Sequence, residues 1–148
     1  MIARLTLDDL ATATQIHSES FEKSWQAGSL KTHIDNDICF GVFSEDARRD
    51  LSGFVIIRPA ADQAEIITIA VSPALRGAGL GGALITHGCQ ALKAAGVLVV
   101  FLEVAEDNLA AIALYKNCGF APIGRRPAYY RREGGRVAAL TYRKDLSA

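Results

Sequence analysis

Two kinds of hydrophobic pattern divide the chain. Short apolar runs rich in β-branched residues predict strands, and segments in which apolar residues recur every three to four positions predict helices. The predicted strands cover 2–7, 38–43, 51–58, 64–71, 97–104, 120–124 and 137–144, and the predicted helices cover 8–20, 29–35, 80–95 and 108–117. This order predicts an α/β protein with a central mixed, mostly antiparallel sheet of about six to seven strands and helices on both faces.

Local signals predict where some of these elements begin and end. Gly96 and Gly119 follow the last apolar positions of two helices, and glycine readily adopts the left-handed conformation that ends a helix. Glu106 or Asp107 can cap the helix at 108–117. We expect the basic and aromatic segment 125–136 to be a loop between the last two strands.

The composition is typical of one compact globular domain that covers residues 1–148. Half of the residues are hydrophobic and 22% are charged. Sixteen basic residues balance sixteen acidic ones, so the total charge does not suggest direct binding to nucleic acid or to an acidic membrane. No apolar run approaches the ~20 residues that span a bilayer, and the first residues lack the pattern of a signal peptide. We therefore expect a cytoplasmic protein.

The cysteines do not form a metal-binding pattern. Cys39, Cys89 and Cys118 are scattered and odd in number, and no pair has metal-ligand spacing. We interpret them as small buried thiols in a reducing cytosol. The histidines lie far apart, and His87 is expected to pack against or beside the core. No metal is expected.

A glycine-rich turn at 76–82 joins the strand at 64–71 to the following helix. Glycines allow the backbone to fold tightly with its N–H groups pointing one way, and the helix dipole adds positive potential at the same place. Arg76 adds a formal positive charge. Together these features predict a pyrophosphate-binding site, without naming the molecule that carries the pyrophosphate.

One alternative for this turn is a dinucleotide site. Gly77, Gly79 and Gly82 match the G-x-G-x-x-G fingerprint, and Glu103 lies about twenty residues later, where a ribose-binding acid belongs. Against it, five residues including Pro73 separate the strand from the first glycine, and the 45 residues after Glu103 are too few for a doubly wound sheet. A tight turn without a ligand is the other alternative.

Two segments together resemble the GNAT superfamily of acetyltransferases. Arg76-Gly-Ala-Gly-Leu-Gly is similar to the [Q/R]-x-x-G-x-G/A signature of that family, and Asn108-Leu-Ala-Ala-Ile-Ala-Leu-Tyr-Lys-Asn-Cys-Gly-Phe is similar to its N-x-x-A-x-x-L-Y-x-x-x-G-F pattern. The joint match covers residues 64–124 with consistent spacing. It implies the GNAT fold and an N-acetyltransferase that moves an acetyl group from acetyl-CoA to an amine.

The resemblance also implies roles for particular residues. Glu103 would be the general base and Tyr115 the general acid. The strand end before the turn would pair with the pantetheine arm of acetyl-CoA, and the turn would hold its pyrophosphate. The residues implied in binding acetyl-CoA are Ile69, Ala70, Val71, Arg76, Gly77, Ala78, Gly79, Leu80, Gly81 and Asn108.

Each proposed role has a structural alternative. Glu103 is the sole ionisable residue of an apolar strand, so it has a partner, faces a wet cleft or titrates upward. A carboxylate raised toward neutrality suits a base, whereas a strand-end salt bridge is the alternative. Tyr115 could instead pack under the sheet with its hydroxyl bonded, and Asn108 could simply cap its helix.

A finer resemblance, to the RimI type of the family, concerns the acceptor. It implies acetylation of the N-terminal alanine of a small-subunit ribosomal protein. The residues that carry it are Leu102-Glu103-Val104, Trp25, Arg125-Arg126 and Tyr129-Tyr130, and the chain departs from that type at Pro127-Ala128 and Val137-Ala138. Trp25 and the tyrosine pair could equally be core or loop packing.

The acceptor class has alternatives of its own. An α-amine with a pKa of ~7.7–8.0 is neutral more readily than a lysine at ~10.4, which favours a protein N-terminus. A small amine, such as a polyamine or an aminoglycoside, is another possible acceptor. A non-catalytic acyl-CoA-binding module is the alternative from a different class.

Overall fold

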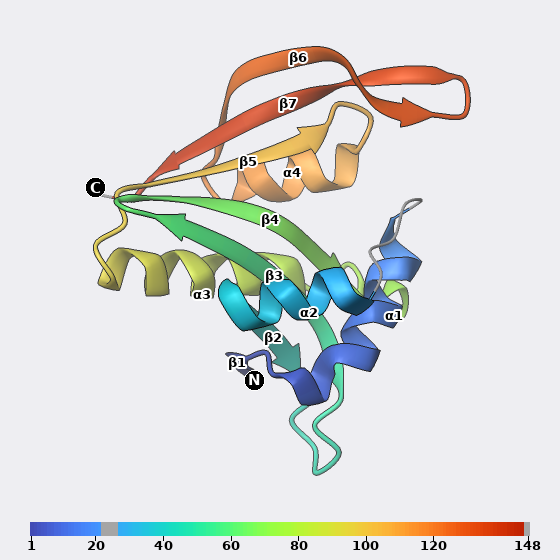
Figure 1. Ribbon diagram of the computed structural model, residues 1–148, viewed down its shortest axis with the longest axis vertical. Coiled ribbons are helices and arrows are strands. Elements are labelled where there is room, and N and C mark those ends of the chain that lie inside the picture. Colours follow the sequence, from blue (N-terminus) through green and yellow to red (C-terminus); the bar gives the residue numbers. More distant parts are fainter. Residues whose placement is uncertain (22–26, 147–148) are drawn as a thin grey trace.

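The computed structural model describes residues 1–21 and 27–146, which form a seven-stranded sheet with helices around it (Figure 1). The strands are β1 (Ile2–Arg4), β2 (Ile38–Phe43), β3 (Leu51–Ala60), β4 (Gln63–Val71), β5 (Val99–Ala105), β6 (Ala121–Arg132) and β7 (Gly135–Asp145). The α-helices are α1 (Leu10–Ser20), α2 (Ala27–Asn36), α3 (Leu80–Ala94) and α4 (Leu109–Asn117), and the short 3-10 helices are η1 (Leu7–Asp9) and η2 (Pro73–Leu75).

The order of strands across the sheet is β1-β2-β3-β4-β5-β7-β6. β4 and β5 run parallel, and the other neighbouring strands run antiparallel. A parallel pair needs a crossover, which α3 supplies. α1 and α2 cover one face of the sheet, and α3 and α4 cover the other (Figure 1). The predicted fold class is confirmed, and a doubly wound dinucleotide fold is excluded because that fold is built on a mostly parallel sheet.

Alternate residues of β3 build a core on each face of the sheet. Phe54 and Ile56 belong to the core under α1 and α2, whereas Val55 and Ile57 belong to the core under α3. All four side chains are at most 1% exposed. This two-sided burial explains why the strand is a continuous apolar run rather than an alternating one.

The predicted loop at 125–136 is wrong. That segment is the outer half of a long β6–β7 hairpin, which closes where Arg132 pairs with Gly135. β6 is an edge strand of the sheet, so Pro127 is tolerated there although it cannot donate a ladder hydrogen bond. The arginines and tyrosines that were predicted to lie in a loop therefore lie on a paired strand beside β7.

The starts of two helices also differ from the prediction. β1 ends three residues earlier than predicted, η1 occupies part of the remainder, and α1 begins only at Leu10. α4 is capped by Asn108, whose Oδ1 accepts a hydrogen bond from the Ala111 N–H (3.2 Å). The predicted caps, Glu106 and Asp107, form ion pairs with arginines of β6 instead.

The ends of α3 and α4 follow the prediction. Gly96 and Gly119 both have a φ of 91°, the left-handed conformation that glycine adopts without steric cost. The longest of the described helices, α3, has 15 residues. Within residues 1–21 and 27–146, no helix is long and apolar enough to cross a membrane.

β4 and β5 pair over only part of their length. Their ladder ends at Ile66 and Leu102, although β4 continues for five residues and β5 for three. At Ile67, β4 has one more residue than β3 opposite it, and such a bulge bends a strand. The two strands therefore separate beyond this point (Figure 1), and their facing backbone groups have no strand partner there.

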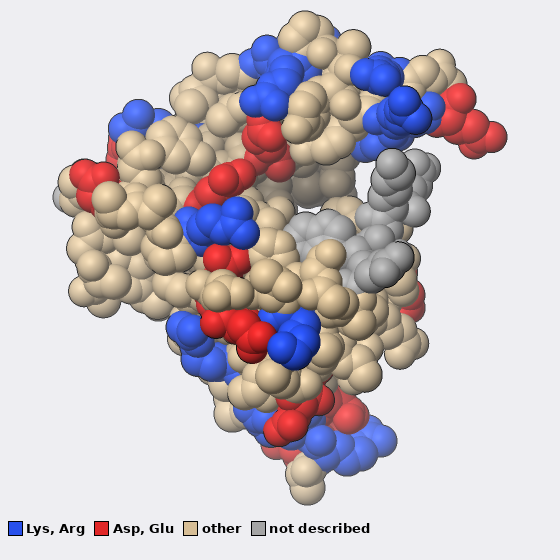
Figure 2. All heavy atoms as spheres, viewed as in Figure 1, with Lys and Arg blue, Asp and Glu red and all other residues tan. Residues whose placement is uncertain are grey.

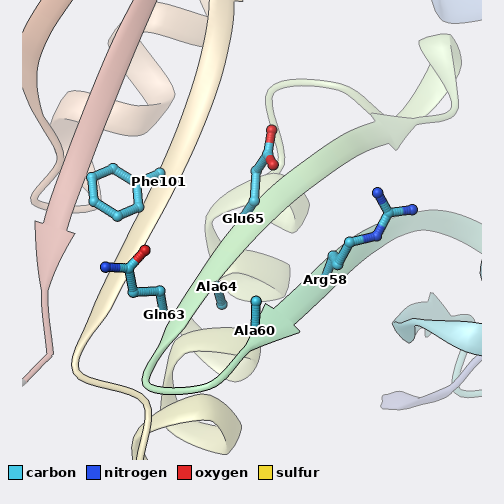
Figure 3. A pocket seen from close by; sticks show the side chains of 6 residues that line it. All are labelled: Arg58, Ala60, Gln63, Ala64, Glu65 and Phe101. Carbon is cyan, nitrogen blue, oxygen red and sulfur yellow. The ribbon is translucent and has the colours of Figure 1, made fainter.

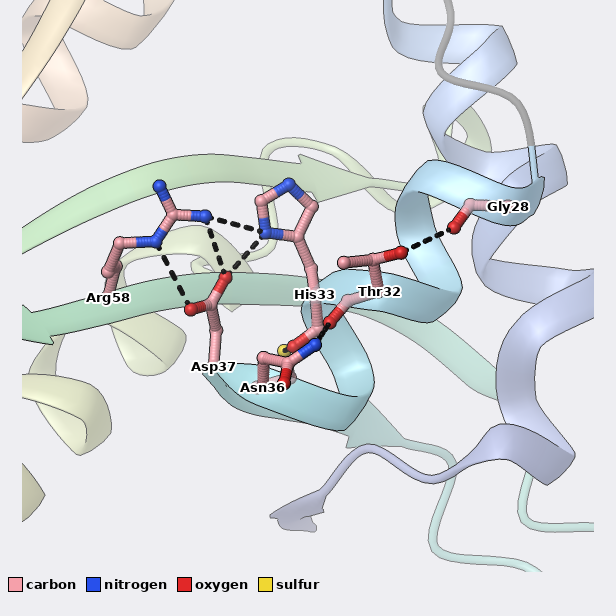
Figure 4. A network of polar contacts seen from close by, with 7 residues as sticks. Gly28, Thr32, His33, Asn36, Asp37 and Arg58 are labelled. Carbon is pink, nitrogen blue, oxygen red and sulfur yellow. Dashed lines mark hydrogen bonds and ion pairs between the residues drawn. The ribbon is translucent and has the colours of Figure 1, made fainter.

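A polar network ties α2 to the sheet (Figure 4). The Asp37 carboxylate lies 2.5 Å from His33 Nδ1, and it accepts hydrogen bonds from Arg58 Nε (3.2 Å) and Nη2 (3.3 Å). Burial opposes ionisation of Asp37, but the bonds from His33 and Arg58 outweigh burial and lower the pKa of the carboxyl group. The charged form of Asp37 is therefore the form that stabilises the fold.

Replacing Asp37 tests this network. Because its folded-state pKa is lowered, the stabilisation from Asp37 is complete above the ordinary value of 3.8 and is lost as the pH falls below it. Asp37→Asn should reduce the free energy of unfolding at pH 7 by about 1–3 kcal/mol and should flatten its dependence on pH below 4. Urea unfolding from pH 2.5 to 7 measures both.

Asp35→Asn is the matched control for Asp37→Asn. Asp35 pairs with Lys31 on the exposed side of the same helix, and such pairs contribute about 0.3–0.5 kcal/mol. Equal losses in the two variants would show that the buried network has no special part in stability.

Candidate active site

The turn between β4 and α3 leaves the start of a helix open. Gly77 and Gly79 have φ values of 85° and 82°, and a Cβ added at either would have no atom within 4 Å. Gly79 is the N-cap of α3 and has no side chain to bond the first-turn N–H groups. These N–H groups and the helix dipole form an anion site with free space in front of it.

The other residues of this turn differ in exposure and packing. Ala78 is exposed, whereas Leu80 is half-buried and packs against the core under α3. A Cβ added at Gly81 would lie 3.1 Å from Leu114 Cδ2, so glycine at this position allows α4 to approach α3 closely. This packing role of Gly81 was not visible in the sequence, because the contact joins two elements that lie far apart in it.

Arg76 connects the turn to two other elements. Its Nε donates a hydrogen bond to the Val71 carbonyl (3.1 Å) at the end of β4, and its Nη2 donates one to Ser20 Oγ (3.0 Å) at the end of α1. Within the described part of the chain, these bonds use two of the five guanidinium N–H donors. The exposed guanidinium therefore keeps donors and its charge for an anion.

The C-terminal end of β4 offers an open backbone edge. Val71 and Ala70 pair with β3 on one side, but the ladder with β5 has already ended at Ile66. Ala70 is buried against α1 and α2, whereas Ile69 and Val71 are half-buried. The free edge can accept an extended ligand as an added strand.

Glu103 lies near the end of β5 with its side chain 28% exposed. Its Oε2 lies 3.5 Å from Arg126 Nη2 on β6. No hydrogen bond or ion pair joins its Oε1 to the described residues. The carboxylate thus has a charged partner at one oxygen and an open second oxygen. Two of the environments predicted for Glu103, a charged partner and an exposed position, therefore occur together.

Tyr115 is buried (6% exposed), and its ring packs edge-on against Phe120 at a centroid distance of 6.0 Å. Its hydroxyl has no hydrogen-bond partner among the described residues. In the same residues, every fully buried side-chain N or O atom has a partner, so this hydroxyl is not sealed from solvent. Burial raises the pKa of Tyr115, and the nearby Cys118 and Tyr130 raise it further.

Tyr130 links the two predicted catalytic residues. Burial raises the pKa of Tyr130 first and the charge of Glu103 raises it next, while Tyr130 in turn acts on Tyr115. Tyr130 therefore lies within electrostatic reach of both Glu103 and Tyr115. Tyr129 is 46% exposed and stands at 82° to the Tyr130 ring, whereas Trp25 lies outside the described residues.

Asn108 lies exposed at the start of α4, and its side-chain oxygen caps the helix. Asn108 therefore caps its helix, as the sequence allowed. The cap occupies Oδ1 alone, so the amide N–H₂ group remains available to a ligand. The role of Asn108 in binding acetyl-CoA stays a prediction.

The three cysteines and His87 are explained by burial and packing. Cys39 and Cys89 are buried and Cys118 is half-buried, and all three are free thiols. Burial raises the pKa of each, for Cys39 to about 12, which keeps them protonated and unreactive. His87 packs edge-on against Phe40 at 4.6 Å, as predicted. The described residues contain no group of His, Cys, Asp or Glu that could hold a metal.

Two depressions of the surface lie on different parts of the sheet. Figure 2 shows the molecule hollowed between the β6–β7 hairpin and the helices α1 and α2, on the side where β4 and β5 separate. Figure 3 shows a pocket at the opposite, paired end of β4 and β5. Its lining residues are Arg58, Ala60, Gln63, Ala64, Glu65 and Phe101. None of the predicted site residues lines that pocket, whereas Val71 and Glu103 lie at the end where β4 and β5 have separated. The separated end is therefore the candidate site.

The comparisons with known proteins agree with this geometry. Residues 10–120 match the family described as the acetyltransferase (GNAT) family, and the chain belongs to this family. Family members transfer acetyl groups from acetyl-CoA, so the predicted enzyme class and cosubstrate are confirmed. The non-catalytic alternative is set aside.

Individual members of the family are similar to this chain in sequence and in structure. The chain is 34% identical over 147 residues to the ribosomal protein bS18-alanine N-acetyltransferase of Escherichia coli (strain K12), covering 99% of this chain and 97% of that protein. The crystal structure of the Escherichia coli ribosomal-protein-S18-alanine N-acetyltransferase has a TM-score of 0.92 at 30% identity, covering 100% of this chain and 94% of that one. An uncharacterized protein of Mycobacterium leprae (strain TN) is 34% identical over 139 residues; these cover 90% of this chain but 38% of that protein.

The residues present fit acetyl-CoA. A pyrophosphate needs N–H donors and positive charge, which the uncapped start of α3 and Arg76 provide. A pantetheine arm, which contains amides, needs an extended partner with N–H and C=O groups that lack a strand partner. The end of β4 has such an edge, although the Val71 carbonyl already accepts a hydrogen bond from Arg76. The free space at Gly77 and Gly79 leaves room for the phosphates.

Replacing Arg76 tests the anion site. Arg76→Ala should weaken acetyl-CoA binding about tenfold or more, since a hydrogen bond from a charged group contributes about 1.5–3 kcal/mol. Ser20→Ala is the matched control, because it removes one contact of Arg76 and keeps the charge. Calorimetric titration measures both affinities, and equal losses would assign Arg76 to packing against α1. NAD should bind neither variant nor the wild type.

Proposed function

We propose that the chain transfers the acetyl group of acetyl-CoA to the α-amine of an N-terminal alanine in a ribosomal protein. The observation that carries the proposal is the position of Glu103, which lies on β5 beyond the point where its ladder with β4 ends. Tyr130 lies within electrostatic reach of both Glu103 and Tyr115. The Escherichia coli relative, matched over nearly its whole length, supports this acceptor.

Glu103 suits the role of general base in this proposal. An amine attacks only in its neutral form, so a proton must leave the ammonium group first. Oε1 of Glu103 is open to accept that proton, while Oε2 faces Arg126. Because the pKa values of an α-amine and a lysine differ by about 2.5 units, a neutral lysine is harder to reach by about 3.5 kcal/mol. A site with one base therefore favours an N-terminal amine.

Tyr115 suits the role of proton donor. Acetyl-CoA, when bound, supplies a thioester whose sulfur gains negative charge as the amine attacks. The raised pKa keeps the Tyr115 phenol protonated, so it can donate a hydrogen bond at this point. A thiol with a pKa of ~8.5 is the stronger acid, so complete transfer from the phenol is uphill. We therefore assign to Tyr115 hydrogen-bond donation in the transition state, with solvent completing the proton transfer.

The charges at the end of β5 favour a peptide over a small polycation. Arg125, Arg126 and Arg132 of β6 neutralise the acids at the end of β5 and in the following turn. A polyamine would be attracted by unpaired acids, whereas an extended peptide can use the exposed Tyr129 and the tyrosine beside it. A ribosomal protein as acceptor places the reaction in the cytoplasm, where thiols stay reduced.

A panel of acceptors tests the proposal. With labelled acetyl-CoA, the protein should acetylate an alanine-first peptide far faster than the same peptide with a blocked N-terminus and an internal lysine, or than spermidine, because only the first acceptor offers an amine of low pKa. Mass spectrometry locates the acetyl group. Faster acetylation of spermidine would overturn the proposed acceptor and would support the small-amine alternative.

The two catalytic roles predict different defects. Glu103→Gln should lower turnover about 10²–10⁴-fold at pH 6–7, and the loss should shrink above pH ~8 as the acceptor deprotonates by itself. Tyr115→Phe should lower turnover without changing acetyl-CoA affinity, and a more acidic thiol in the acyl donor should reduce its defect. Glu65→Gln, on the exposed face of β4 at its paired end, is the control. Parallel pH–rate profiles with defects under threefold would leave both residues structural.

A further inference from the structure

Three arginines of β6 face three acids that follow one another along the chain at the end of β5. The pairs are Arg126 with Glu103 (3.5 Å), Arg125 with Glu106 (3.3 Å) and Arg132 with Asp107 (2.8 Å). Two of these acids lie in the turn after β5, and the third is the proposed base. Arg126 is therefore the one of these three arginines that contacts the proposed base, whereas Arg125 and Arg132 contact acids of the turn.

The register of the hairpin brings Arg126 to Glu103. Glu103 pairs with Thr141 of β7, and Arg126 pairs with Ala139, two residues earlier in β7. Residues two apart in a strand point to the same face. Arg126 and Glu103 thus project from the same side of the sheet, and the guanidinium reaches the carboxylate across β7.

A wide bulge follows Arg126. The ladder continues only at Tyr130, opposite Val137, so three residues of β6 face one residue of β7. Within the bulge, Ala128 has a φ of 53°, a conformation that costs a residue other than glycine some energy. Because Val137 and Ala139 share a face, the bulge returns Tyr130 to the side on which Arg126 and Glu103 lie.

Arg126 has two contacts that define its position. Its Nη2 lies 3.5 Å from Glu103 Oε2, and its guanidinium carbon lies 4.6 Å from the centre of the Tyr129 ring. The ring supports the guanidinium from one side while the carboxylate binds it from the other. We propose that Arg126 is a positioning residue for Glu103: it holds one carboxylate oxygen and thereby directs the other toward the acceptor amine. This inference rests on the proposed role of Glu103 as the base.

The geometry of the pair argues against a role in stability. The side chains of Arg126 and Glu103 are 58% and 28% exposed, and an ion pair with one long contact in such surroundings contributes little to folding. The Arg132–Asp107 pair is bidentate, with contacts of 2.8 and 3.0 Å, and suits the task of holding the hairpin. Losing Arg126 should therefore affect turnover more than the melting temperature.

Three arginine variants test the proposal. Arg126→Ala should lower kcat with the alanine-first peptide about tenfold or more, since a small misplacement of a catalytic group has large effects on rate. KM for acetyl-CoA should stay within twofold. Arg126→Lys should recover much of the loss, because an ammonium group can still bind Oε2. Arg125→Ala, which breaks the neighbouring pair on the same strand, should retain at least half of the wild-type kcat.

The melting temperature gives a second readout. Exposed ion pairs contribute little to stability, so Arg126→Ala and Arg125→Ala should both melt within a few degrees of the wild type. A loss of turnover in Arg126→Ala without a loss of stability separates a positioning role from a structural one.

A double variant separates the two proposals. If Glu103→Gln keeps its activity, the proposed base is wrong. If Glu103→Gln is inactive but Arg126→Ala behaves like Arg125→Ala, only the positioning role fails. If both hold, Arg126→Ala should cause no further loss in the Glu103→Gln background, since Arg126 acts through the carboxylate. Equal losses from Arg125→Ala and Arg126→Ala would assign both to the general attachment of the hairpin.

Discussion

The separation of β4 from β5 beyond Ile66 and Leu102 is the constraint on which the rest of the site depends. Backbone N–H and C=O groups need partners, so a strand edge that its neighbour abandons must meet water or a ligand. The bulge at Ile67 turns β4 away while β5 stays paired with β7 as far as Ala105. An extended ligand can therefore enter the sheet as a missing strand without breaking any pairing.

The same separation lets groups from the two faces of the sheet act together. Tyr115 belongs to the core under α3 and α4, whereas Glu103 alternates with Leu102 and Val104 and points to the other face. A continuous sheet would keep two such groups apart. Where β4 and β5 diverge, the sheet is interrupted, and Tyr130 lies within electrostatic reach of both groups. The close approach of α4 to α3 at Gly81 helps to bring Tyr115 to this gap.

The fold and the glycine turn could be predicted because their signals are local. The two-sided burial of β3 appears in the sequence as an apolar run, and Gly96 and Gly119 mark helix ends by their conformational freedom. The order of strands limited the topology enough to reject a doubly wound sheet. The partner of Glu103 could not be predicted, because Arg126 reaches it through the register of two strands that lie far apart from β5 in sequence.

The hairpin was mispredicted for a related physical reason. Proline and glycine are poor strand signals, and 125–136 lies on an edge where no core selects apolar residues. What orders β6 is its ladder with β7 and the ion pairs to the end of β5. The bidentate Arg132–Asp107 pair suits the task of holding the hairpin. The Arg126–Glu103 pair has one long contact and exposed side chains, so it adds little to stability and is better explained by the positioning of the proposed base.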